Sequence, residues 1–169
     1  MIINILCENH TGTHLPKQCT AEWGLPFFIQ EQGLNILFDT GHTGAFIKNA
    51  LAMGLAAEIV DYIVLSHHHW DHINGLFRHS FESRKKLILH PDILNNITPN
   101  EKEYLLSHFD IISSQSPYYL RSDIIFLGEI PRVIHFEKGT YKDLPMNDDS
   151  ALVIITKKGL VVISGCSHC

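Results

Sequence analysis

The sequence has little positive charge and no long hydrophobic segment. Lys and Arg together number 13 against 18 Asp and Glu, so the formal net charge is −5 at pH 7. This balance argues against a surface built to bind nucleic acid or anionic membranes. No run approaches the roughly 20 apolar residues of a membrane-spanning helix, and the N-terminus lacks the basic and apolar segments of a signal peptide. We therefore expect a soluble, cytoplasmic protein with neither a membrane nor nucleic acid as its partner.

Cysteine is also scarce. Cys7, Cys19, Cys166 and Cys169 lack the regular spacing of a secreted disulfide framework, so we expect reduced thiols. No second C-x-x-C pair accompanies the one at 166–169, which disfavours a zinc ribbon. Histidine, in contrast, occurs 12 times. Because neutral imidazole is the commonest metal-binding side chain, the composition points to a metal site.

The length of 169 residues and the 45% hydrophobic content fit a single domain over residues 1–169 with a buried core. Strands at both ends with helices between them predict a mixed α/β architecture. Residues 111–148 are predicted to be loop-rich, with strands only near 124–127 and 133–136. The other predicted elements are a strand at 1–7, hairpins at 24–39 and 151–164, strands at 62–66 and 86–90, and helices at 46–53, from 73, from 91 and at 100–109.

The clearest chemical signal is the histidine cluster SHHHWDH, which begins at residue 66, the last residue of the predicted strand at 62–66. If the backbone continues extended, His67, His69 and Asp71 share one side, because side chains alternate along a strand. A helix that begins near His72 would turn that imidazole toward the same space. Imidazole and carboxylate both ligate zinc at about 2.0–2.2 Å, so the four side chains can converge on metal. The alternative is a histidine-rich surface turn, which the preceding strand disfavours.

Neighbouring residues are weaker candidates. His68 and Trp70 alternate away from the proposed metal face, and we expect them to pack or to face solvent. Asp148 and Asp149 are adjacent acids before a strand, which is the usual pattern of a solvated turn. We do not predict a catalytic role for these two acids.

The cluster resembles the signature of the metallo-β-lactamase superfamily. FDTG at 38–41 matches the Asp-Thr-Gly that this superfamily places after a preceding strand, and GCSH at 165–168 matches the position of its third metal histidine. EWGL at 22–25, the form SHHHWDHINGL of the signature and DDSAL at 148–152 are most similar to the branch named after 7,8-dihydropterin-6-methyl-4-(β-D-ribofuranosyl)aminobenzene-5′-phosphate synthase.

The resemblance implies an αββα sandwich of two similar halves, from which the C-terminal part of the second half would be missing. It also implies a set of site residues. His67, His69 and His168 would hold the first metal, Asp71 and His72 part of a second, and Asp39 would orient a ligand histidine. The favoured cofactor is Zn2+, as one or two ions, with Fe2+, Mn2+ or Mg2+ as alternatives.

The leading functional expectation is a metal-dependent hydrolase. The metal would lower the pKa of coordinated water from 15.7 toward about 7, and Asp71 and His72 would be the catalytic residues. In the synthase branch the implied reaction instead joins a pterin methyl carbon to an arylamine with loss of diphosphate. Thioesterase and phosphodiesterase activities stay open, because the superfamily keeps its metal site and varies its loops. The expected substrate is a small molecule that carries a phosphate or diphosphate.

The alternative from another class is a truncated, catalytically silent metal-binding fragment. The last predicted hairpin, 151–164, is apolar on both faces. Uncovered strands of this kind recruit partners. We therefore expect a homo-oligomer, exchange of elements between subunits, or pairing with a separate C-terminal piece.

Overall fold

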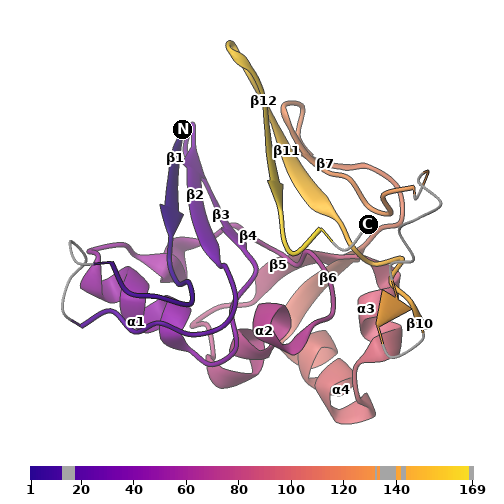
Figure 1. Cartoon of the computed structure of the whole chain (residues 1–169), viewed down its shortest axis with the longest axis horizontal. Coiled ribbons are helices and arrows are strands. Elements are labelled where there is room, and N and C mark those ends of the chain that lie inside the picture. Colours follow the sequence, from indigo (N-terminus) through magenta and orange to yellow (C-terminus); the bar gives the residue numbers. More distant parts are fainter. Residues whose placement is uncertain (13–17, 132, 134–139, 142–143, 168–169) are drawn as a thin grey trace.

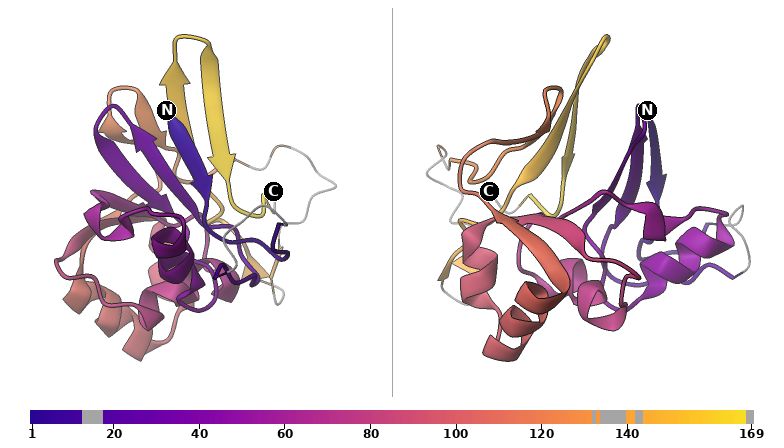
Figure 2. Two further views of the ribbon diagram at one scale, coloured as in Figure 1. Left: turned by 90° about the vertical axis from the view of Figure 1, so that its left-hand side faces the viewer. Right: turned by 180° about the vertical axis from the view of Figure 1, so that it is seen from behind.

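The protein is built from two β-sheets and a layer of helices (Figure 1). The structure, a computed structural model, describes residues 1–12, 18–131, 133, 140–141 and 144–167. Figure 2 shows that the strands of both sheets rise from the helical side of the molecule and that β1 diverges from the β11–β12 hairpin toward the strand tips. Within these described residues, no helix is long and apolar enough to cross a bilayer.

The larger sheet has six strands in sequence order, β1 to β6. Pairing is antiparallel from β1 to β3 and parallel from β3 to β6. The parallel half places the carboxyl ends of β3, β4 and β5 at one edge, where ligand sites form in α/β sheets. The strands are β1 Ile2–Ile5, β2 Phe27–Glu31, β3 Leu34–Phe38, β4 Tyr62–Val64, β5 Lys85–Leu89 and β6 Phe109–Ser113.

The helices connect the parallel strands. They are α1 Ala45–Ala52, α2 Trp70–Ile73, α3 Pro91–Asn96 and α4 Pro99–His108, with short 3-10 helices η1 Ala57–Ile59 and η2 Asn74–Arg78. α4 begins with a capping box, in which the Thr98 hydroxyl accepts from the Glu101 backbone N–H while the Glu101 carboxylate accepts from the Thr98 backbone. Leu51 of α1 is 77% exposed, whereas Phe46 and Ala50 of the same helix are buried.

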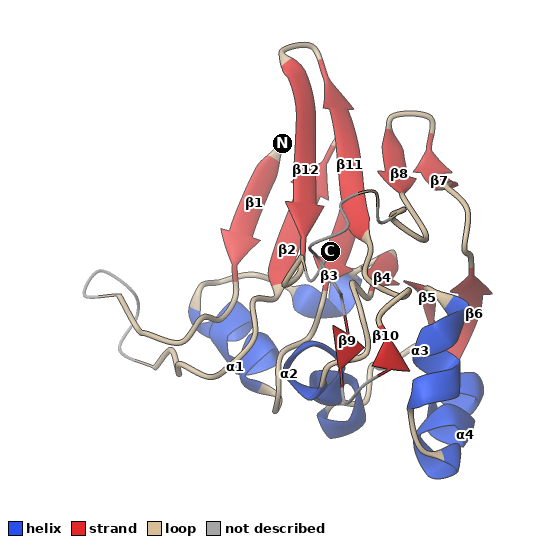
Figure 3. Cartoon of the chain, turned by 45° about the vertical axis from the view of Figure 1, so that its right-hand side comes forward, coloured by secondary structure: helices blue, strands red, loops and turns tan. Residues whose placement is uncertain are grey.

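The smaller sheet is antiparallel throughout, in the order β12-β11-β8-β7 (Figure 3). Its strands are β7 Tyr118–Arg121, β8 Ile124–Phe126, β11 Ala151–Thr156 and β12 Gly159–Ser164. A separate two-stranded ribbon pairs β9 Thr140–Tyr141 with β10 Leu144–Pro145.

Two hydrophobic cores hold the layers together. One lies between the two sheets and joins Phe38 and Val64 of the larger sheet to Phe126 and Leu152 of the smaller one. The other lies between the larger sheet and the helices, where Phe46 of α1 belongs to the same cluster as the sheet residues. The central strands β2 to β5 of the larger sheet are therefore largely buried on both faces, which explains why they are mostly apolar.

Most predicted elements are confirmed, including both hairpins, the strand before the histidines and the helices at 46–53 and 100–109. The predicted loop-rich segment was partly wrong, because it contains most of β6 and all of β7. These short strands are only half-buried along much of their length, so their sequence carries no clear alternation. The predicted strand at 133–136 falls largely outside the described residues.

Candidate metal centre

The centre begins at the carboxyl ends of β3 and β4. Parallel pairing sets Phe38 opposite Val64, so Asp39, which follows Phe38, and Ser66, two residues after Val64, lie at the same edge of the sheet. Asp39 Oδ1 accepts a hydrogen bond from the Ser66 backbone N–H at 2.8 Å, and Asp39 Oδ2 accepts one from the Ser66 hydroxyl at 2.7 Å. Both residues are fully buried.

His72 reaches this edge because the short loop 65–69 leads from β4 directly into α2. Thr40 anchors the helix, since its backbone N–H and its hydroxyl both donate to the His72 carbonyl, at 2.8 and 2.9 Å. The His72 ring then lies against Asp39, with Nδ1 2.7 Å from Asp39 Oδ2. Burial alone would lower the pKa of His72, but the adjacent Asp39 carboxylate, followed by Asp71 and Asp149, raises it above its usual value.

Asp39 sets the orientation of a second histidine through Ser66. A hydroxyl has one hydrogen, and that of Ser66 goes to Asp39. His67 Nδ1, 2.8 Å from Ser66 Oγ, must therefore donate its N–H to that oxygen. In both His67 and His72, Nδ1 carries the hydrogen, so Nε2 presents the lone pair that a cation needs. The two rings lie 4.2 Å apart between centroids.

The end of β12 packs directly against these histidines. A side chain at Gly165 is excluded, because a Cβ there would lie 2.2 Å from Ser66 Oγ and 3.2 Å from His67 Nδ1. This close approach brings the next residue, Cys166, over His72, with Sγ 3.1 Å from Nε2. In the part of the chain that the structure describes, His67, His72 and Cys166 form a group whose ligand atoms all lie within 4.8 Å of one another.

Cys166 is the site residue that sequence reasoning missed. The sequence placed it only in a weak C-x-x-C half-site, and its contact with His72 spans 94 residues. Its position in GCSH, two residues before the predicted ligand His168, was the available signal. Burial, and then the nearby carboxylates of Asp71, Asp39 and Asp149, raise the pKa of the Cys166 thiol to about 11 in the metal-free protein.

The other predicted ligands have different positions. The His69 ring lies 4.6 Å from that of His67, between centroids, and His69 is the N-cap residue of α2. Asp71 Oδ2 lies 3.7 Å from His72 Nε2. His168 lies outside the described residues. For all three residues, metal ligation remains a prediction.

The expectation of a solvated turn at 148–149 was wrong. Asp148 is fully buried and Asp149 is 3% exposed. Asp148 Oδ2 accepts from the His68 backbone N–H at 2.8 Å and lies 2.7 Å from His68 Nδ1. Burial would raise the pKa of Asp148, but the hydrogen bonds from His68 hold it below its usual value. The Asp148–His68 contact therefore ties the start of β11 to the histidine cluster.

A cavity of about 410 Å³ opens beside the centre. Gly24 makes it possible, because a Cβ at Gly24 would lie 2.1 Å from the Asp71 carbonyl oxygen, so a side chain there would displace this segment from the centre. Trp23 is 62% exposed at its rim. The lining residues include Glu8, Trp23, Leu25, Asp71, His72 and Cys166.

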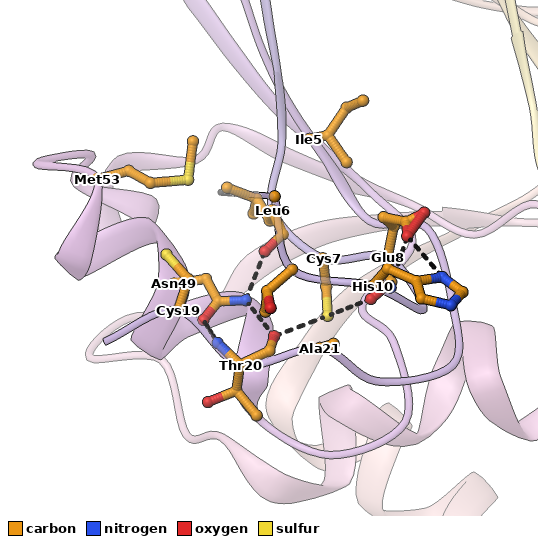
Figure 4. Close-up of a pocket in the computed structure, with 12 residues that line it drawn as sticks. Ile5, Leu6, Cys7, Glu8, His10, Cys19, Thr20, Ala21, Asn49 and Met53 are labelled. Carbon is orange, nitrogen blue, oxygen red and sulfur yellow. Dashed lines mark hydrogen bonds and ion pairs between the residues drawn. The ribbon is translucent and has the colours of Figure 1, made fainter. Parts of the chain in front are cut away.

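A second cavity of about 400 Å³ lies behind the segment that follows β1, and Glu8 lines both cavities (Figure 4). Its wall is fixed by the buried Asn49 of α1. The Asn49 amide donates to the Leu6 and Thr20 carbonyls at 2.7 and 2.9 Å and accepts from the Thr20 backbone N–H at 2.8 Å. These bonds hold Leu6 and Thr20 against α1.

The donor set fits a divalent cation. Two imidazoles and a thiol are ligand types that zinc prefers. The hydrogen bond from His72 Nδ1 to Asp39 is the carboxylate–histidine arrangement that orients metal-binding imidazoles and raises their basicity. Asp39, predicted to orient a ligand histidine, thus lies where that role requires, and the role itself remains a prediction.

The sequence model of the metallo-beta-lactamase superfamily matches residues 24–166, which is most of the chain. The chain belongs to this superfamily. The predicted membership is therefore confirmed, and the mixed α/β architecture agrees with the metallo-β-lactamase fold. Members of the superfamily usually bind metal ions, in agreement with the donor set described above.

Two relatives come from Methanocaldococcus jannaschii. One is an uncharacterized protein, 33% identical over 187 residues, a match that covers 99% of this chain and 70% of that protein. The other is named 7,8-dihydropterin-6-methyl-4-(beta-D-ribofuranosyl)-aminobenzene-5′-phosphate synthase. It is 32% identical over 200 residues, covering 98% of this chain and 67% of the synthase. The resemblance to the synthase branch is thereby confirmed.

Solved structures agree with the fold. Tm1679, a metal-dependent hydrolase of the beta-lactamase superfamily, superposes with a TM-score of 0.70 at 26% identity, and the match covers 98% of this chain and 66% of Tm1679. The chain thus spans slightly less than two thirds of that protein. A quorum-quenching N-acyl homoserine lactone lactonase superposes with a TM-score of 0.56 at 19% identity over 82% of this chain and 58% of the lactonase, a likeness of fold alone.

Proposed function

We propose that the protein is a metal-dependent enzyme with hydrolase-type chemistry. The observation that carries this proposal is the convergence of His67, His72 and Cys166 within 4.8 Å beyond the carboxyl end of β4. When bound there, a divalent ion, with Zn2+ favoured, would supply Lewis acidity and make water a stronger nucleophile at neutral pH. Metal analysis of the purified protein would show whether it binds one ion or two.

The protein's own residues would orient the metal ligands and accept the proton of the attacking water. Asp39 holds Nδ1 of His72 directly and that of His67 through Ser66, so both Nε2 atoms face the same space. Asp71 lines the cavity, and its carboxylate would take the proton of the attacking water as a general base. A small substrate that carries a phosphate or diphosphate would lie in this cavity.

The first test is metal analysis followed by activity. Zinc-loaded protein is assayed on generic phosphodiesters and thioesters, together with His67→Ala and the matched imidazole control His108→Ala. His108 lies exposed at the end of α4. Hydrolysis that is lost in H67A and kept in H108A supports the proposal. Wild-type protein that holds metal but hydrolyses neither class contradicts it, and far-ultraviolet circular dichroism shows whether H67A is folded.

A synthase reaction is the second candidate, because the relative with that name is 32% identical over 98% of this chain. The exposed Trp23 at the cavity rim offers a flat surface on which an aromatic ring can stack. Here the metal would polarise a diphosphate leaving group. The distinguishing observation is metal-dependent binding of inorganic diphosphate without hydrolysis of the generic substrates. Trp23→Ala should weaken pterin binding and leave diphosphate binding unchanged.

The third candidate is a silent metal-binding chain that acts with a partner. β1 and β12 are edge strands, and both expose apolar side chains, with Ile2 59%, Ile5 52%, Leu160 65% and Val162 60% exposed. Such edges favour homo-oligomers or pairing with another chain. Solution scattering across concentrations tests this, with Val162→Lys expected to weaken association and Leu106→Lys on α4 as the exposed control. A strictly monomeric wild type contradicts association. Catalytic turnover by the 169-residue chain contradicts the hypothesis of a catalytically silent protein.

A further inference from the structure

The Cys166 thiol faces the two histidines whose tautomers Asp39 controls. Its sulfur lies 3.1 Å from His72 Nε2, the nitrogen on the opposite side of the ring from the Asp39 bond. His67 and His72 are 0% and 2% exposed, so the two nitrogen donors are deeply buried. Cys166 is the exposed member of this group of three residues, and it lines the 410 Å³ cavity.

The position of the sulfur is determined by the backbone. Gly165 lies too close to Ser66 and His67 for any side chain, which fixes the end of β12 against the loop that follows β4. Directly after Cys166, Ser167 adopts a φ of +53°, and its hydroxyl donates to Ser164 Oγ at 2.8 Å. A left-handed residue of this kind costs energy, and such strain is found where the surroundings enforce a geometry. The turn therefore holds Cys166 over the centre from both sides.

We propose that Cys166 is a metal ligand, with its thiolate sulfur and the Nε2 atoms of His67 and His72 binding one divalent cation. This inference rests on the metal dependence proposed above and deepens it. Metal binding replaces the thiol hydrogen: the S–H bond breaks, the proton leaves to solvent and the sulfur bonds the cation. Two borderline nitrogens and one soft sulfur select zinc over magnesium or manganese, which prefer oxygen.

A second reading of the geometry is a structural hydrogen bond, in which the Cys166 thiol donates to His72 Nε2 and no cation is involved. In that case the sulfur and the metal would compete for the same nitrogen. Metal binding would then leave Cys166 as an ordinary thiol beside the site. The two readings differ in one measurable property, which is whether sulfur is bonded to the cation.

Cobalt substitution measures this property directly. Metal-free wild type, Cys166→Ser and the matched thiol control Cys19→Ser are titrated with Co2+ and followed by absorption spectroscopy. We expect wild type and C19S to show a near-ultraviolet thiolate-to-cobalt charge-transfer band, and C166S to lose it while visible cobalt bands persist. A band retained in C166S, or cobalt bound to wild type without the band, overturns Cys166 ligation and leaves metal dependence intact. No binding of Co2+ to wild type overturns both.

Alkylation gives an independent readout. Protein is treated with iodoacetamide with and without Zn2+, and the labelled cysteines are identified by mass spectrometry. We expect Zn2+ to protect Cys166 and to leave Cys19 labelling unchanged. Chelator competition should also show a loss of Zn2+ affinity of about 10-fold or more in C166S, with little change for Mg2+. Equal Zn2+ affinity in C166S and wild type, with both folded by circular dichroism, contradicts ligation by sulfur.

Discussion

The carboxylate of Asp39 lies 2.7 Å from Nδ1 of His72, although 33 residues separate them in the chain. The same carboxylate accepts two hydrogen bonds from Ser66, whose hydroxyl in turn receives the N–H of His67. One buried acid therefore controls the ring orientation and the tautomer of two candidate ligands. This relationship gives the first prediction.

Asp39→Asn should weaken Zn2+ binding by about 10- to 100-fold, the range typical for the loss of a carboxylate behind a metal-binding histidine. Asn tolerates the φ of +56° at this position, so the backbone is retained. Ser66→Ala removes the hydroxyl that links Asp39 to His67 but keeps the Asp39–His72 contact, so Zn2+ binding should weaken less than in D39N. The measurement is competition with a chromophoric chelator. Asp110→Asn, an exposed acid on β6, is the control and should bind as wild type does.

Gly165→Ala should destabilise the fold and weaken metal binding together. The added Cβ would lie 2.2 Å from Ser66 Oγ and 2.8 Å from Ser66 Cβ, so β12 or the loop after β4 must move. Overpacking of this kind costs about 1–3 kcal/mol. Urea unfolding of the metal-free protein measures the loss. At Gly44 a Cβ meets only ordinary contacts, the nearest at 3.7 Å, so Gly44→Ala should be close to wild type. Unchanged stability in G165A would contradict the packing described for β12.

Asp148→Asn tests the contact between β11 and the histidine cluster. The folded-state pKa of Asp148 is lowered, so its contribution to stability is present above the unfolded value of 3.8 and is lost as pH falls through the folded value. At pH 7 we expect a loss of about 1.5–3 kcal/mol, as for a buried hydrogen bond to a charged group. The difference between variant and wild type should shrink below about pH 4. Urea unfolding at several pH values measures this, and a difference that stays constant with pH contradicts the assignment.

Metal affinity should fall as pH is lowered, which can be followed as the pH of half-maximal Co2+ binding at a fixed Co2+ concentration (the midpoint). The pKa of His72 is raised, despite burial, by Asp39 and then Asp71, so a proton competes with the cation for Nε2 at higher pH than in an ordinary histidine. In the metal-free protein the same shift stabilises the fold at low pH, and this contribution disappears as pH rises through the folded-state pKa. Cobalt titrations between about pH 5 and 8 measure the midpoint. In D39N the midpoint should move to lower pH, and an unchanged midpoint would argue against the Asp39–His72 coupling.

Much of the architecture could be predicted because its signals are local. Two apolar runs around a glycine turn predict the hairpin of β2 and β3. Gly54 likewise predicts the end of α1, whose last helical residue is Ala52. β7 was missed, because a half-buried strand at the edge of a sheet carries little alternation. Asp148 was misjudged because its partner His68 lies 80 residues away, and nothing near Asp148 in the sequence reveals that contact.

The sequence by itself determined that a strand ends in a cluster of histidines and that a helix follows, because strand and helix periodicity depend on neighbouring residues. Only the tertiary structure decided which other groups meet that cluster. Parallel pairing of β3 with β4 brings Asp39 beside Ser66, and the close packing of Gly165 brings Cys166 over His72. Contacts between residues 27 and 94 positions apart depend on how the sheets pair and pack, and short-range patterns do not encode that.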